Sequence, residues 1–178
     1  VESPALDGDA ESGYTATFPT DLPIAEQTLF PITPSQSNGI EDARFVQFED
    51  GTYYGTYTAY DGRQIAPEMV ATRDFNSYRF LPLRGTALRN KGLALFPRKV
   101  GGLYTMLGRQ DGENNYLMQS DDLLNWNETH LLTTPKFDWE IVQSGNCGSP
   151  LETEAGWLVL THGVGPTRKY SIGVMLLD

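Results

Sequence analysis

Acidic and basic side chains stand at the two outer ends of one predicted hairpin. They are Glu41, Asp42 and Arg44 at its beginning and Asp61 at its end. Between them, Asp50-Gly51 is a turn signal that separates two strand-like runs, and an antiparallel hairpin brings its outer ends together. The four side chains are therefore predicted to line one polar patch, in which paired carboxylates accept hydrogen bonds from sugar hydroxyls. The alternative is a salt bridge on an edge strand.

Asp61 allows two interpretations. Flanked by Tyr57 and Tyr60 at the end of a strand, its carboxyl could have a raised pKa and act as a general acid. Asp61 also precedes Gly62, and aspartate beside glycine is a common structural choice in turns. The spacing alone favours the turn.

A repeating order of strands and turns positions these residues. From Asn38 onward, a strand, a turn, an aromatic-led strand, a second turn and a third strand recur with a period of about 50 residues, which is typical of β-propeller blades. The approximate blades are 38–89, 90–140 and 141–178. Residues 1–37 are acidic and rich in proline, and predict a flexible end followed by an edge strand. The alternative to a propeller is a meander or sandwich with chance similarity between the units.

Side chains that could take part in catalysis or binding lie at equivalent strand ends in all three units. Asp61, Arg109 and His162 each lie at or near the end of the second strand of their unit. In a propeller such ends point to one channel, so the three side chains are predicted to converge. A guanidinium and an imidazole there suit an anionic substrate such as phosphate. The alternatives are that Arg109 pairs with Asp111 and that His162 is a hydrogen-bonded rim histidine.

The amino-acid composition argues against some classes of binding partner. The chain of 178 residues has a net charge of −10 at pH 7, which argues against nucleic acids and anionic membranes. No apolar run approaches the roughly 20 residues that span a bilayer. Cys147, the single cysteine, permits no intrachain disulfide and is expected to be a small buried side chain. We expect no metal and a reduced bacterial cytoplasm as the location.

Several motifs together resemble glycoside hydrolase family 130. They are NGIEDARF, YTAYDG, KGLALFPRKVGGLYTMLGRQDGENNYL, GNCGSP and GWLVLTHGVGPTRKYSIGVMLLD. The family comprises β-mannoside phosphorylases and some β-mannosidases on a five-bladed propeller. The resemblance therefore implies an all-β chain that supplies about three blades and acts on short β-mannosides, with inorganic phosphate as co-substrate and no other cofactor.

The resemblance also implies roles for single residues. Asp61 matches the proposed general acid, which acts through the sugar 3-hydroxyl while phosphate attacks the anomeric carbon with inversion. The implied sugar contacts are Asn38, Glu41, Asp42, Arg44 and Tyr60. The implied phosphate ligands are Arg109 and His162. Lys91 and Arg168, which lie on predicted loops beside the same strands, are further candidate phosphate ligands from the sequence itself. Gln143 stands where many members have a basic residue.

The missing fourth and fifth blades leave alternatives open. A homo-oligomer or a completing chain would supply the rest of the ring. The alternatives to phosphorolysis to mannose 1-phosphate are hydrolysis by a β-mannosidase of the same family and a non-catalytic carbohydrate-binding or assembly fragment.

Overall fold

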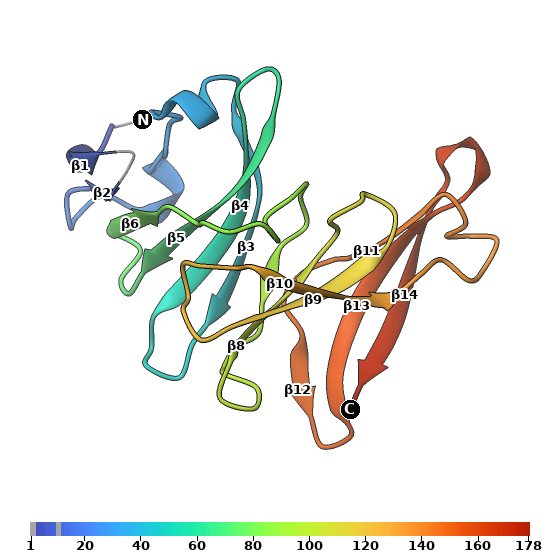
Figure 1. Ribbon diagram of the computed structural model, residues 1–178. Helices are drawn as coiled ribbons and strands as arrows, with labels where there is room; N and C mark the ends of the chain where they lie inside the picture. The colour runs from blue at the N-terminus through green and yellow to red at the C-terminus, as the bar shows by residue number, and fades with distance from the viewer. Residues whose placement is uncertain (1–2, 10–11) are drawn as a thin grey trace.

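The computed structural model describes residues 3–9 and 12–178 as three antiparallel sheets that follow one another along the chain (Figure 1). The first sheet has the strand order β1-β2-β6-β5-β4-β3. Its strands are β1 (Ala5–Asp9), β2 (Gly13–Thr17), β3 (Ile40–Gln47), β4 (Tyr53–Tyr60), β5 (Ile65–Thr72) and β6 (Ser77–Leu81). Hairpins with tight turns join β3 to β4 and β4 to β5, because Gly51 and Gly62 adopt the positive φ that these turns require.

The second and third sheets have four strands each. The second, in the order β10-β9-β8-β7, consists of β7 (Ala94–Leu95), β8 (Tyr104–Gly108), β9 (Asn115–Ser120) and β10 (Glu128–Thr133). In the third, β13 pairs with all of the others, which are β11 (Gln143–Asn146), β12 (Leu151–Thr153) and β14 (Tyr170–Leu177), while β13 itself is Gly156–Val164. The helical elements described are three short 3₁₀ turns: η1 (Ile24–Glu26), η2 (Pro34–Gln36) and η3 (Pro166–Arg168). None of the helices described is long and apolar enough to cross a membrane.

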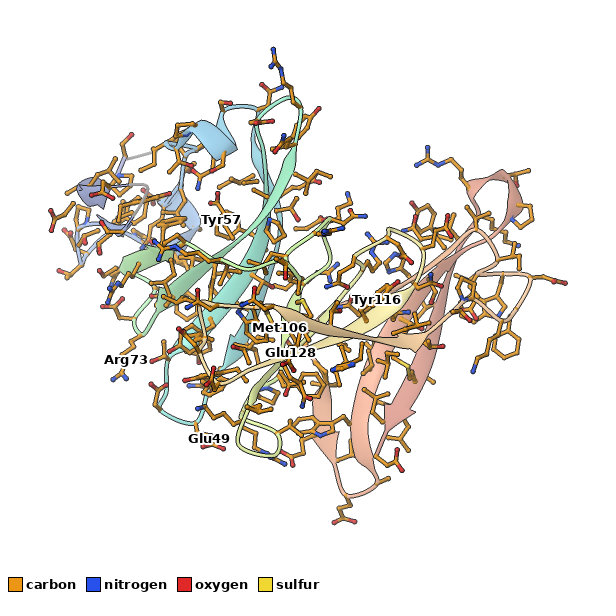
Figure 2. All side chains as sticks on the ribbon, viewed as in Figure 1. Glu49, Tyr57, Arg73, Met106, Tyr116 and Glu128 are labelled. Carbon is orange, nitrogen blue, oxygen red and sulfur yellow. The ribbon has the colours of Figure 1, made fainter. Side chains whose placement is uncertain are left out.

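Three apolar clusters hold the layers together. The N-terminal segment packs on the first sheet around Phe18, Tyr57 and Phe80. The first and second sheets meet around Met106, which Figure 2 shows near the middle of the molecule, and the second and third sheets meet around Trp157. Apolar packing thus joins the N-terminal segment to the first sheet and each sheet to the next. This packing fixes the strand ends relative to one another.

The prediction of an all-β fold is confirmed. A closed ring of five blades stays a prediction. The N-terminal expectation was wrong in one respect: β2 pairs with both β1 and β6 and is not an edge strand. The edge is β1, which lies in the segment expected to be flexible; residues 1, 2, 10 and 11 of that segment lie outside the described residues. Acidic composition did not predict β1, because its pairing depends on a hairpin with β2.

Candidate active site

A bulge in β3 decides where its charged residues point. Pairing with β4 shifts between Glu41 and Arg44, which lie opposite Thr58 and Thr56, and Asp42 within the shift has a φ of 58°. Cross-strand partners project from the same face, so the bulge turns Glu41 and Arg44 to one face, whereas a regular strand sends residues three apart to opposite faces. This face meets the second sheet, since the Thr56 hydroxyl donates a 2.6 Å hydrogen bond to the carbonyl of the residue before β7.

A groove of about 400 Å³ opens beside the bulge. It is lined by Asn38, Gly39, Ile40, Glu41, Thr58, Tyr60 and Ile65. Three of the predicted sugar contacts, Asn38, Glu41 and Tyr60, therefore share one groove. The Glu41 carboxylate also forms a 3.3 Å salt bridge with Lys91 Nζ. Lys91, a predicted phosphate ligand, is therefore paired with a residue of the groove.

Two of the predicted phosphate ligands come together at the third sheet. Arg109 follows β8 and is 5% exposed, and His162 on β13 lies opposite Gly145 on β11. A Cβ atom on Gly145 would lie 2.7 Å from Arg109 Cδ and 2.8 Å from His162 Cε1, so both side chains pack against the bare backbone of this glycine. Only glycine allows so close an approach without displacing them.

Arg44 belongs to the same cluster. Burial lowers the pKa of Arg109 first, and the positive charge of Arg44 lowers it further. Burial likewise lowers the pKa of His162, and Arg109 and Arg44 add to this effect while the carboxylate of Asp42 opposes it. Arg44, which the family resemblance made a sugar contact, thus also acts through its charge on the predicted phosphate ligands.

The cationic cluster, which consists of Arg44, Arg109 and His162, has hydrogen-bond donors without partners. Among the buried side-chain atoms described, Nε and Nη1 of Arg109 and Nη1 of Arg44 make no hydrogen bond. Buried charges without partners are strongly destabilising, and guanidinium groups match the oxygen atoms of phosphate or carboxylate. The arrangement is therefore suited to bind an oxyanion between two guanidinium groups and an imidazole.

Three neighbours of the cluster were not predicted. The ring of Tyr170 stacks on His162 with 6.1 Å between centroids, and Asn146 is fully buried with an unpartnered Oδ1. Cys147 was expected to be buried but is exposed, with its Sγ 3.9 Å from His162 Nδ1. The sequence indicated that Asn146 and Cys147 belong to the site only in that they follow Gly145, the residue that pairs with His162.

Of the two interpretations of Asp61, the raised pKa was wrong, and the turn residue that the spacing favoured is the one that the structure shows. Its carboxylate accepts hydrogen bonds from the backbone N–H groups of Gln64 and Arg63, at 2.6 and 2.7 Å, and these lower its pKa. Asp61 is exposed in the turn between β4 and β5. The predicted convergence holds for Arg109 and His162, which pack against the same glycine. For Asp61 the structure shows the two backbone hydrogen bonds of its turn.

The structure also places Asp111, the alternative partner of Arg109, and Arg168. Asp111 does not pair with Arg109, because its carboxylate accepts hydrogen bonds from the N–H groups of Glu113 and Asn114 and from the Tyr116 hydroxyl. Arg168 lies exposed in η3.

Comparison with known proteins identifies relatives of this chain. The model of glycoside hydrolase family 130, described as beta-1,4-mannooligosaccharide phosphorylase, matches residues 22–178. A beta-1,2-mannobiose phosphorylase from Listeria innocua is 32% identical over 158 residues, which are 84% of this chain and 43% of that protein. A 1,2-beta-oligomannan phosphorylase from a Thermoanaerobacter species is 32% identical over 149 residues, which are 82% of this chain and 50% of that protein.

A solved structure extends the similarity to three dimensions. The beta-1,2-mannobiose phosphorylase of Listeria innocua, in complex with beta-1,2-mannobiose, matches with a TM-score of 0.73 and 30% identity over 84% of this chain and 44% of that one. The chain thus spans about half the length of the curated relatives it matches. The family model covers most of the sequence, and the chain belongs to glycoside hydrolase family 130.

Proposed function

We propose that this protein takes part in the phosphorolysis of short β-mannosides. The observation that carries the proposal is the cluster of Arg44, Arg109 and His162, whose unpartnered buried donors suit an oxyanion. Relatives at 30–32% identity are named as mannoside phosphorylases, which supports the same choice of co-substrate. If phosphate is the nucleophile, the site needs cations where it binds and no second carboxylate as base.

The proposed reaction places the mannoside in the groove and phosphate at the cationic cluster. A phosphate oxygen forms a bond to the anomeric carbon, the glycosidic carbon–oxygen bond breaks on the opposite side, and the leaving oxygen takes a proton. The products are mannose 1-phosphate and the shortened mannoside. The configuration at the anomeric carbon is inverted because there is a single displacement.

Asp61 is the proposed source of that proton, through the sugar 3-hydroxyl. In the free protein two backbone N–H groups stabilise its carboxylate, so a bound mannoside must exclude water from the turn and raise the pKa of the carboxyl. An Asp61→Asn variant keeps an oxygen that accepts the turn bonds. We expect turnover to fall by roughly 10²–10⁴-fold, the usual contribution of a general acid, with folding unchanged.

The direct test compares products with and without phosphate. β-1,2-mannobiose and β-1,4-mannobiose are each incubated with the protein, and mannose 1-phosphate is measured. Phosphate-dependent formation of mannose 1-phosphate supports the proposal. Free mannose as the sole product, unaffected by phosphate, supports the hydrolase instead. Mannoside binding without turnover at high protein concentration supports a non-catalytic fragment.

A further sheet is proposed to complete the site. The outer face of the third sheet carries five exposed apolar side chains, Leu151, Leu160, Ile172, Val174 and Leu176. His162 lies on this same face, opposite Ile172, which is 76% exposed. The first two sheet-to-sheet contacts bury such faces, and the relatives have about twice the length of this chain. We propose that a further β-sheet covers the face and closes the cationic cluster.

Sedimentation and dye binding test this part. We expect the chain to sediment as a monomer that binds an apolar fluorescent dye, and Val174→Lys to reduce the dye signal. A stable dimer that Val174→Lys dissociates would make a second copy the occupant and would overturn the proposal.

A further inference from the structure

A glutamine at the back of the first sheet has every hydrogen-bonding position in use. Gln36, at the end of η2, is 0% exposed. Its Oε1 accepts from the backbone N–H of Ile32 at 3.0 Å, and its Nε2 donates to Glu68 at 2.7 Å and to the Tyr57 hydroxyl at 3.1 Å. A buried amide with all its partners is specific to glutamine, because an apolar residue of the same size leaves those partners unsatisfied.

Glu68 on β5 is the second centre of this network. Its carboxylate accepts hydrogen bonds from Ser35 Oγ at 2.5 Å, from Tyr57 Oη at 2.6 Å and from Gln36 Nε2 at 2.7 Å. Burial, followed by the charge of Glu68, raises the pKa of Tyr57, so its phenol remains a proton donor near neutral pH. Tyr57 on β4 and Glu68 on β5 thereby hold Ser35 and Gln36, two consecutive residues of the segment that precedes β3.

The segment that contains Ser35 and Gln36 continues directly into residues that line the groove. The N–H of Gly39 donates to the carbonyl of Gln36 at 2.8 Å, and the N–H of Asn38 donates to the carbonyl of Tyr60, also at 2.8 Å. Tyr60 in turn donates from its N–H to the carbonyl of Gly39 at 3.0 Å. Two residues after Gln36, the chain therefore lines the groove and borders the turn that holds Asp61.

The network and the groove use opposite faces of β4. Tyr57 points to the back, where Figure 2 shows it on the side of the N-terminal segment, whereas Thr58 and Tyr60 line the groove. Alternate residues of a strand point to opposite faces, so a shift of the network on one side moves the wall on the other.

We infer that Gln36 and Glu68 are positioning residues, which set the distance between the Asn38–Glu41 wall and Tyr60 and so determine how the groove receives its sugar. They do not touch the ligand themselves. The identity of that ligand as a mannoside rests on the proposed function, whereas the control of the wall does not.

The test uses two variants and a matched control. Gln36→Leu removes the amide, and Glu68→Gln keeps the shape but removes the carboxylate that accepts the hydrogen bonds of Ser35, Gln36 and Tyr57. Tyr14→Phe is the control, because its hydroxyl belongs to the same network but reaches Gln36 only at 3.5 Å and holds no part of the wall. If Gln36→Leu does not fold, Glu68→Gln carries the test.

Hydrogen exchange and ligand titration are the readouts. In the first two variants we expect faster exchange of the Asn38 and Gly39 amides and roughly tenfold weaker β-1,2-mannobiose binding, with sulfate affinity within about twofold of the parent chain. Unchanged exchange at Asn38 and Gly39, or an equal loss of sulfate affinity, would overturn the inference. If the parent chain binds no mannoside but the variants still show faster exchange, the proposed function fails and the positioning role stands.

Discussion

Two buried polar clusters in this protein differ in whether their atoms have partners. In the network at the back of the first sheet, Gln36, Glu68 and Tyr57 satisfy one another. In the cationic cluster, Arg109 and Arg44 keep buried donors that bond to nothing in the described chain. A satisfied network stabilises one conformation, whereas unpartnered charges destabilise the free protein and are retained where a ligand pairs with them. The contrast separates the scaffold from the site.

Arg109→Met gives the largest effect expected from this contrast. Removing the buried guanidinium should weaken sulfate binding by about 100-fold, since charge-assisted hydrogen bonds to the anion are lost. The free energy of unfolding should stay the same or rise, because an unpartnered buried charge is replaced by an apolar chain. Calorimetric titration and urea unfolding measure the two quantities.

The control for that experiment is Arg168→Met in the exposed η3 turn. It should leave sulfate affinity and unfolding unchanged. An equal loss of affinity in the Arg168 and Arg109 variants would mean that general surface charge, rather than the buried cluster, binds the anion.

Gln36→Leu should show the opposite pattern. We expect the free energy of unfolding to fall by about 2–3 kcal/mol, because the N–H of Ile32 and the hydroxyl of Tyr57 lose a buried partner. Sulfate affinity should remain unchanged. Urea unfolding that is insensitive to this substitution would remove the distinction between the two clusters.

The pH dependence of His162 sharpens the comparison further. Its pKa is lowered from 6.5, so the folded protein holds the imidazole neutral at pH 7 and releases its proton more readily than the unfolded chain. This contribution to stability is present above about pH 6.5 and is lost as the pH falls below it, because the unfolded state then binds more protons.

Anion binding should depend on pH in the opposite sense. A bound dianion favours the imidazolium, so sulfate affinity should rise by about three- to tenfold between pH 7 and pH 5. Sulfate is the appropriate probe because phosphate titrates in the same range. His162→Gln should flatten the profile, and a parent chain with no pH dependence would place His162 outside the anion site.

Lys91→Met is expected to have the smallest effect. Its ammonium group is partly exposed and already paired with Glu41, and such pairs contribute about 0–1 kcal/mol. Sulfate affinity should change by less than about threefold. A tenfold loss would return Lys91 to the predicted phosphate ligands.

The sequence predicted those features that depend on local signals or on repetition. Glycine turn pairs such as Asp50-Gly51 located the hairpins, and equivalent strand ends brought Arg109 and His162 together. The bulge at Asp42 was not predictable, since it depends on the register between β3 and β4. The interpretation of Asp61 as a turn residue, which the spacing favoured, describes its hydrogen bonds in the structure.

Long-range partners could not be predicted from the sequence. Gln36 meets Glu68 across 32 positions and Tyr57 across 21, and nothing local to η2 identifies either partner. The role of Arg44 was missed for a related reason, because its effect on Arg109 depends on how the sheets pack together and not on a signal within β3. Packing between sheets, rather than propensity within one, determines both.

The most direct test follows the arginine side chains by NMR while sulfate is added at constant ionic strength. The Nε–H resonance of Arg109 should shift in a saturable manner, together with those of Arg44 and the His162 ring, and with a stoichiometry of one anion per chain. A shift confined to exposed arginines such as Arg168, or a response at Arg109 that does not saturate, would contradict the assignment of this cluster as the oxyanion site.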